Sequence, residues 1–156
     1  MLVLENALRK ARAGLALAGG EQRTVALGVD TEVMLEGRTL GKAETEGEAR
    51  RRLTLLSGRT HEVLSGMALV GGESGERTGL ARSQVTFRRL DRETIELYLA
   101  SGEWRDRAGA YAIQGLGSIL IDRLEGDFSN VVGLPLQVLL SLAPDLLKNS
   151  PPKVQG

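Results

Sequence analysis

The sequence contains no cysteine, which excludes disulfides, thiolate metal sites and a cysteine nucleophile. Aromatic residues are scarce: two Phe, two Tyr and one Trp are too few for the stacking platform of a single-strand nucleic-acid binder. Twenty basic side chains balance twenty acidic ones, so no overall field attracts nucleic acid or a membrane. No apolar run approaches the roughly 20 residues that span a bilayer, and no signal peptide opens the chain. We therefore expect a soluble, cytoplasmic protein with neither nucleic acid nor membrane as a partner.

Glycine, by contrast, is concentrated in one short segment, residues 107–117, where three glycines surround Tyr111 and Gln114. Glycines at this density mark a loop in which the backbone turns tightly or approaches another group closely. The side-chain amide of Gln114 offers two donors and an acceptor, which is enough to read the edge of a nucleobase. A plain connection between a helix and a strand explains the same pattern, since a lone glycine-rich loop is weak evidence of a site.

Hydrophobic spacing along the 156 residues predicts a single domain of the α/β class, covering residues 1–156. Helical spacing or capping signals occur over residues 1–18, 46–56, 94–100 and 136–142, and strand patterns over 24–28, 60–70, 77–90 and 118–124. The chain opens with a helix, whereas most α/β domains of this size open with a strand. We expect the proline-containing tail, residues 144–156, to be unstructured.

Asp30 and Thr31 stand at the end of the first predicted strand, whose continuous apolar run is typical of a strand covered on both faces. Ligands of open α/β sheets gather at strand ends, so a carboxylate in this position is a candidate catalytic group. A solvated aspartate in a loop explains the same pattern equally well.

Two other features carry no catalytic role in our interpretation. The arginines of residues 50–52 are compatible with a phosphate site, but consecutive residues fan around a helix, which favours a solvated face. His61 is the only histidine and has no carboxylate partner nearby in the sequence. We therefore assign it no part in proton transfer.

Four blocks stand in a recognisable order and spacing. They are Gly-Val-Asp-Thr-Glu-Val at 28–33, Leu-Gly-Lys at 40–42, Leu-Ser-Gly-Arg-Thr-His-Glu-Val at 56–63, and 108–117 with Asp-Phe-Ser-Asn-Val-Val-Gly-Leu-Pro at 127–135. Together they resemble the Maf family of nucleoside triphosphate pyrophosphatases, and the likeness extends from Asn6 to Leu142. The resemblance implies an ITPase/Maf-like α/β fold, with a mixed, elongated sheet, flanking helices and a cleft between two lobes.

Members of this family hydrolyse the α–β anhydride of a nucleoside triphosphate to the monophosphate and pyrophosphate. The resemblance therefore implies a nucleoside triphosphate substrate, a divalent metal (Mg²⁺ or Mn²⁺) as cofactor, and a homodimer.

The same resemblance suggests roles for five residues. Asp30 matches the acidic residue proposed as the base for the attacking water or as a metal ligand. Lys10 and Lys42 match lysines that face the phosphates, which suits the compact charge of an ammonium group. Thr31 and Gln114 match positions associated with selection of the base.

The residues around Gln114, from Ala108 to Gly115, look like the branch of the family that acts on dTTP and UTP. The branch that acts on 7-methyl-GTP tends to carry glutamate where Gln114 stands. A neutral amide suits a pyrimidine, because the edge of that ring presents both a donor and acceptors.

The sequence departs from the family pattern before Asp30. The family normally opens with a strand and a Ser-x-Ser-Pro-Arg-Arg loop that holds the triphosphate, followed by an acidic segment. Neither is found here, and the first serine is Ser57. We expect a natural start upstream of Met1 rather than a degenerate relative, because the remaining motifs look undamaged.

Three hypotheses follow. The first is a nucleoside triphosphate pyrophosphatase acting on dTTP, UTP or modified pyrimidine nucleotides, with Asp30 and Lys42 in catalysis. The second is a non-catalytic, nucleotide-binding remnant of such a protein. The third is a gene fragment that does not fold cooperatively.

Overall fold

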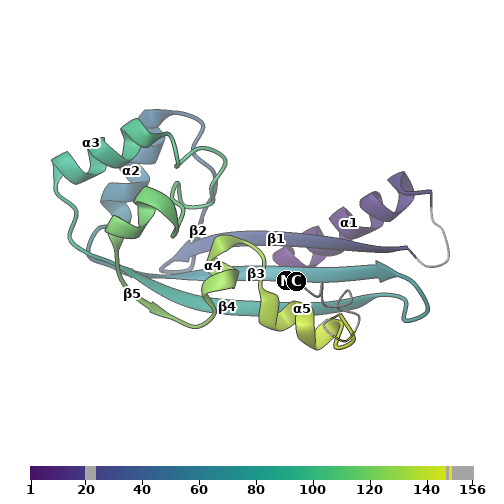
Figure 1. The fold of residues 1–156 in the computed structure, drawn as a ribbon. Helices are drawn as coiled ribbons and strands as arrows, with labels where there is room; N and C mark the ends of the chain where they lie inside the picture. Colours follow the sequence, from purple (N-terminus) through teal and green to yellow (C-terminus); the bar gives the residue numbers. More distant parts are fainter. Residues whose placement is uncertain (20–23, 147, 149–156) are drawn as a thin grey trace, which may run out of the picture.

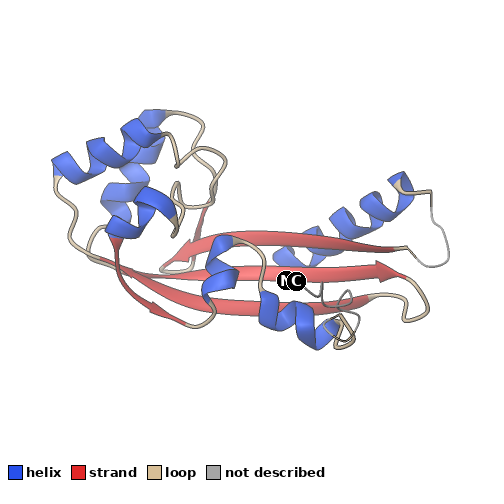
Figure 2. Ribbon diagram, in the orientation of Figure 1, coloured by secondary structure: helices blue, strands red, loops and turns tan. Residues whose placement is uncertain are grey.

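The computed structural model describes residues 1–19, 24–146 and 148, and its centre is an elongated antiparallel sheet (Figures 1 and 2). The strands are β1 (Val25–Leu35), β2 (Arg38–Leu40), β3 (Thr60–Gly71), β4 (Arg77–Phe87) and β5 (Ile121–Glu125). The helices are α1 (Leu2–Leu17), α2 (Glu46–Leu56), α3 (Arg92–Ser101), the 3₁₀ helix η1 (Gly115–Leu120), α4 (Phe128–Val132) and α5 (Leu136–Leu142). None of the described helices is long and apolar enough to cross a bilayer.

The sheet has the strand order β2-β1-β3-β4-β5 and is wider at one end than at the other. The short strands β2 and β5 pair only with the last residues of β1 and β4, respectively. The long strands β1, β3 and β4 continue beyond them as a three-stranded ribbon. Figure 1 shows α2, α3 and η1 gathered at the wide end, which we call the helical lobe, and α1 lying along the narrow end.

The two faces of the sheet carry different helices, because successive side chains of a strand point to opposite faces. Val33 of β1, Val63 of β3 and Val85 of β4 share a core with the helical lobe. The opposite face of the sheet packs against α1. The core residues of this face are Ala7 and Ala11 of α1 and Ala68 and Val70 of β3. The lobe and α1 therefore lie on opposite faces.

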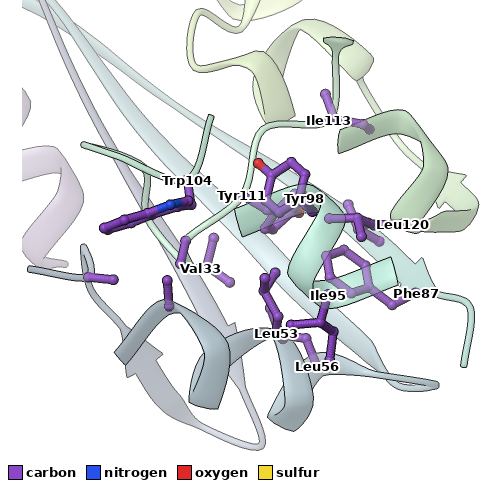
Figure 3. Packing of buried hydrophobic residues seen from close by; sticks show 14 of the residues in the cluster. Val33, Leu53, Leu56, Phe87, Ile95, Tyr98, Trp104, Tyr111, Ile113 and Leu120 are labelled. Atoms are coloured by element: carbon purple, nitrogen blue, oxygen red, sulfur yellow. The ribbon is translucent and has the colours of Figure 1, made fainter. Parts of the chain in front are cut away.

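Large aromatic side chains fill the core of the helical lobe (Figure 3). Trp104, Tyr98 and Phe87 are fully buried. Phe87 packs edge-to-face on Tyr111, with 4.8 Å between ring centroids, a geometry that ring quadrupoles favour. Four of the five aromatic residues therefore pack in this core, and Phe128 alone is exposed.

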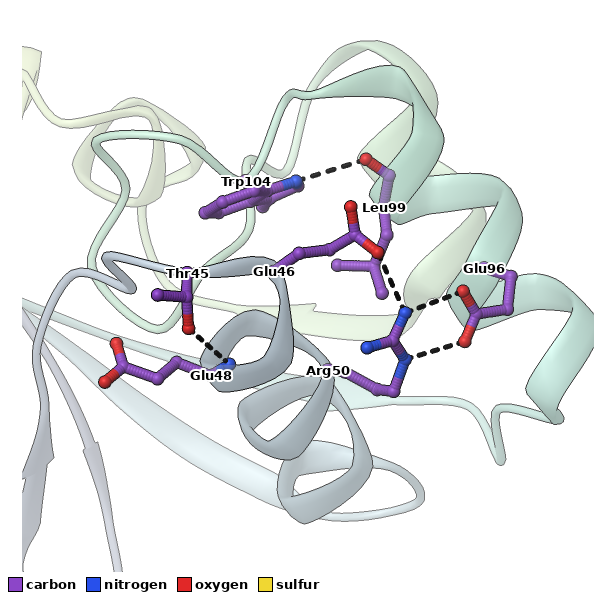
Figure 4. Close-up of polar contacts among 7 residues, drawn as sticks. All are labelled: Thr45, Glu46, Glu48, Arg50, Glu96, Leu99 and Trp104. Atoms are coloured by element: carbon purple, nitrogen blue, oxygen red, sulfur yellow. Dashed lines mark hydrogen bonds and ion pairs between the residues drawn. The ribbon is translucent and has the colours of Figure 1, made fainter.

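Polar contacts order the outer side of the lobe (Figure 4). The Thr45 hydroxyl accepts a hydrogen bond from the Glu48 amide and so caps α2. Arg50 of α2 donates two hydrogen bonds, of 2.7 and 2.8 Å, to the Glu96 carboxylate of α3. Arg52 instead donates to the Gly41 carbonyl at 2.6 Å. The consecutive arginines therefore diverge, and Arg50 orients two helices instead of forming a phosphate site with its neighbours.

Most of the predicted elements are confirmed. The helices predicted over 1–18, 46–56 and 136–142 and the strand over 60–70 agree with the structure within one residue at each end. The α/β class with an elongated sheet and flanking helices is also confirmed. Mixed pairing is not observed, since every pair among the described strands is antiparallel.

Other predictions were wrong. The first strand does not end at Gly28 but runs to Leu35, and it is not covered on both faces, since Val25 and Leu27 are exposed. The strand predicted over 118–124 begins only at Ile121, because η1 occupies the preceding residues. The short elements β2 and α4 were missed. Of the predicted unstructured tail, residues 147 and 149–156 lie outside the described residues.

Two glycines let α1 lie against the sheet. A Cβ atom on Gly28 would overlap the Ala7 carbonyl oxygen, and one on Gly66 would overlap the Val3 carbonyl oxygen. Both glycines are buried under the helix backbone. The close approach therefore depends on the absence of a side chain at these positions.

We predict that Gly66→Ala lowers the free energy of unfolding by about 1–3 kcal/mol, because the added methyl group displaces α1. Urea unfolding followed by circular dichroism measures the change. Gly41→Ala is the matched control, because a Cβ there would meet no heavy atom within 4 Å. Equal stability of the two variants would contradict the described docking of α1.

Candidate active site

A hollow of about 310 Å³ lies where β1 meets the helical lobe. Its lining comes from α1, β1, β2 and the connection that follows it, β3, the loop that follows α3, and the end of α4. The lining residues are Lys10, 29–33, 39–42, Val63, 106–108, Tyr111 and 131–133. Four of the five predicted site residues, Lys10, Asp30, Thr31 and Lys42, belong to this lining.

Asp30 is held by two side chains of α1. Lys10 Nζ lies 2.6 Å from Asp30 Oδ1 and 3.0 Å from the Val29 carbonyl oxygen. Asn6 Nδ2 donates to Asp30 Oδ2 at 2.9 Å. Residues four apart lie on the same side of a helix, which is why one helix supplies both donors. Each oxygen of this carboxylate therefore has a donor.

The predicted position of Asp30 at a strand end was wrong. Asp30 lies in the middle of β1, opposite Gly66 of β3. It borders a hollow all the same, because β2 pairs only with residues 33–35 of β1. Among the described strands, none pairs with β1 alongside Asp30 on that edge. Asp30 is therefore accessible because the neighbouring strand β2 ends before reaching it, and not because β1 itself ends there.

Thr31 points to the opposite face from Asp30, since adjacent residues of a strand alternate. Its Oγ1 atom lies 2.8 Å from Oγ of Ser65, its cross-strand partner on β3. Ser65 is fully buried, whereas Thr31 is partly exposed and lines the hollow. The sequence analysis did not identify Ser65, because only the register between β1 and β3 brings it next to Thr31.

Lys42 approaches from the opposite wall. Its backbone pairs with Ala108 in an antiparallel bridge, which joins the connection before α2 to the loop after α3. Its Nζ atom lies 3.8 Å from Asp106 Oδ1, and the side chain is 65% exposed. This exposed ammonium group is therefore available to an anionic ligand.

Gln114 is not brought to the hollow. Its side chain is exposed and is absent from the lining, although Arg107, Ala108 and Tyr111 of the same loop contribute to it. The role of Gln114 in base selection stays a prediction.

The glycine-rich loop makes hydrogen bonds within the protein that stabilise its own conformation. The Glu103 carboxylate accepts hydrogen bonds from the backbone amides of Leu116 and Gly117, at 3.0 and 3.1 Å. A Cβ atom on Gly115 would lie 2.7 Å from Glu103 Oε1. The glycine at 115 thus lets a carboxylate cap η1, which accounts for part of the pattern without any ligand.

His61 lies beneath the hollow, against one of its lining residues. Its Nε2 atom is 2.7 Å from the Tyr111 hydroxyl, and its side chain is only 2% exposed. Burial lowers the pKa of His61 to about 4 and raises the pKa of Tyr111. Both groups are therefore neutral at pH 7 and serve as a buried, hydrogen-bonded pair.

The described residues contain no group of three or more His, Cys, Asp or Glu side chains placed to hold a metal ion together. The acidic residues lining the hollow are Asp30, Glu32 and Asp106. Mg²⁺ is commonly bound by one or two carboxylates together with phosphate oxygens of a substrate. The donor set therefore fits a cation that arrives with a phosphorylated ligand rather than one held by protein alone.

Comparison with known proteins gives a consistent result. The family model described as Maf-like protein matches residues 1–146. A dTTP/UTP pyrophosphatase of Desulfitobacterium hafniense (strain Y51) is 49% identical over 134 residues, which are 84% of this chain and 60% of the relative. Proteins with the same name from Moorella thermoacetica and Pyrococcus furiosus are 51% and 46% identical, over 83% and 74% of this chain. The chain matches 66% and 60% of their lengths, so it spans less than two thirds of each of these relatives.

We predict that the stability contributed by His61 is lost on acidification. Its pKa is about 4 in the folded chain against 6.5 for an exposed histidine, so folding favours the neutral form. The contribution is complete above pH 6.5 and declines as the pH falls towards 4, by about 2 kcal/mol at pH 5. His61→Gln keeps a hydrogen-bonding group opposite Tyr111 but does not titrate. Urea unfolding of both proteins at pH 7.5, 6 and 5 should show the wild-type advantage shrinking; a difference independent of pH would contradict the burial of His61.

Proposed function

Because this chain belongs to the Maf-like protein family, we propose that it forms the catalytic part of a nucleoside triphosphate pyrophosphatase. The proposed substrates are dTTP and UTP, and the products are the nucleoside monophosphate and pyrophosphate. The relatives named dTTP/UTP pyrophosphatase support this choice. The observation that carries the proposal is the convergence of Lys10, Asp30 and Lys42 on one hollow.

Charge is the first requirement of this reaction. A triphosphate carries about four negative charges, which cations must offset before water can approach phosphorus. Lys10 and Lys42 line the hollow from two walls, and Arg107 adds a third positive charge. The lysines supply compact charges for phosphate oxygens on both sides of a bound chain. A divalent metal, Mg²⁺ or Mn²⁺, would offset further phosphate charge when bound.

Asp30 is the proposed catalytic residue. Lys10 and Asn6 fix its carboxylate at the border of the hollow. In this position it can orient the attacking water and accept its proton, or share a cation with the phosphates. Lys42, 65% exposed, is proposed to hold the phosphates while the anhydride bond breaks.

The remaining parts of the proposal concern the base and the assembly. Thr31 and Gln114 are the proposed base-selecting residues. The position of Thr31 in the lining of the hollow supports this role for Thr31. A homodimer is also proposed. Its support is the apolar surface of α4, α5 and their connection, where Phe128, Leu134, Leu136 and Leu140 are exposed.

We predict that Asp30→Asn lowers kcat by about 10²–10⁴-fold, because the amide cannot accept a proton from water. The measurement is pyrophosphate release from dTTP, UTP, CTP and ATP by the full-length natural protein. Glu62→Gln, which removes a carboxylate of β3 that pairs with Arg82 and does not line the hollow, is the control and should change kcat little. Binding of triphosphates without any turnover dependent on Asp30 would favour the second hypothesis, a nucleotide-binding module.

A further prediction concerns the metal. Removing divalent cations with EDTA should abolish pyrophosphate release, and adding Mg²⁺ or Mn²⁺ should restore it, because Lys10, Lys42 and Arg107 alone leave phosphate charge unbalanced. Calorimetry in EDTA should still detect weaker binding of UTP. Turnover that continues unchanged in EDTA would contradict the proposed metal requirement.

A further inference from the structure

The hollow has two chemically different parts. Its charged groups suit phosphates and lie on two sides, Lys10 and Asp30 towards α1 and Lys42 on the opposite wall. Its other part is a mainly apolar wall around Thr31, because Thr31 shares a face of β1 with Val29 and Val33. The apolar lining residues of this wall are Val29, Val33, Val63, Tyr111, Val131 and Val132. An apolar wall with one hydroxyl group is the kind of surface that receives a planar base and fixes its orientation.

Ser65 determines whether the hydroxyl of Thr31 donates or accepts the hydrogen bond between them. Its neighbour Ser65 has a relative exposure of 0%, so the Ser65 hydroxyl cannot donate to solvent. Within the described part of the chain, the only hydrogen-bond partner of Ser65 Oγ is Thr31 Oγ1, at 2.8 Å. A buried hydroxyl hydrogen without an acceptor is costly, so Ser65 donates and Thr31 accepts.

This polarity decides what Thr31 offers to a ligand. A threonine hydroxyl has one hydrogen and two acceptor sites. Since Thr31 accepts from Ser65, its own hydrogen needs another acceptor, and its side chain borders the hollow. Thr31 therefore presents a hydrogen-bond donor to whatever lies against the apolar wall.

We propose that Ser65 is a positioning residue that makes Thr31 a donor to the 4-keto oxygen of uracil or thymine, and thereby a determinant of selectivity against cytosine. This inference rests on the proposed function. Uracil and thymine carry a carbonyl acceptor at C4, whereas cytosine carries an amino donor at the same position. The Thr31 hydroxyl, held as a donor by Ser65, can pair with the C4 carbonyl of uracil or thymine. Against cytosine, the same hydroxyl would face the C4 amino group, which is also a donor.

The test compares UTP with CTP, which differ at this position of the base. Ser65→Ala frees the Thr31 hydroxyl to rotate and accept, so the UTP-to-CTP ratio of kcat/KM should fall about tenfold. Thr31→Val removes the hydroxyl at nearly constant shape and should also lower the ratio. Thr31→Ser keeps the hydroxyl and should retain the preference. A change in substrate ratio, unlike a loss of rate, is not expected from general damage to the fold.

Thr86→Val is the matched control. Thr60 and Thr86 form another cross-strand hydroxyl pair, with the same 2.8 Å separation, between β3 and β4. Neither residue lines the hollow. Thr86→Val should therefore leave the UTP-to-CTP ratio unchanged. If Ser65→Ala fails to fold, the partly exposed Thr31 still carries the test through its two variants.

The outcomes separate this inference from the proposed function. A wild-type protein without preference for UTP over CTP, or an unchanged ratio in Ser65→Ala and Thr31→Val, overturns the inference while leaving the enzyme in place. If the wild type hydrolyses no triphosphate, the proposed function fails, and calorimetric binding of UTP and CTP decides the inference instead. Tighter binding of UTP that Thr31→Val abolishes supports it; equal binding of the two nucleotides overturns it.

Discussion

The close packing of α1 on the sheet is the contact on which the rest of the site depends. Gly28 and Gly66 allow the helix backbone to rest directly on two strands. At this distance Asn6 and Lys10, one helical turn apart, both reach the carboxylate of Asp30. A helix held further away by even a methyl group would separate these donors from their acceptor. Packing and chemistry thus share one constraint, which explains why small residues face each other at this point.

The sheet itself divides the functions of neighbouring residues. Asp30 and Thr31 are adjacent in the sequence but point to opposite faces of β1. Both border the same hollow because it lies at the edge of β1, beyond the short pairing with β2. An edge therefore gives one ligand access to both faces, with Lys10 and Asp30 on the side of α1, and the apolar wall together with Lys42 on the side of the helical lobe. A nucleotide, which has an anionic end and an aromatic end, matches this division.

Sequence patterns predicted the elements well where periodicity was local. The helices around Leu8 and Leu53 were found because a buried face repeats every three or four residues, whatever the rest of the chain does. The site was predicted in part, since resemblance pointed to Lys10, Asp30, Thr31 and Lys42, which the fold brings to one hollow. Gln114 lies outside that lining, and the glycines beside it serve the capping of η1 by Glu103.

The sequence by itself determined the element types, the family and the chemical groups on offer, because these follow from residue identity and short-range spacing. Only the tertiary structure decided that Asn6 supports Asp30, that Ser65 sets the polarity of Thr31, and that His61 is neutral beneath Tyr111. These pairs are separated by 24, 34 and 50 residues. Strand register and helix docking bring them together, and both depend on the packing of the whole chain rather than on any local pattern.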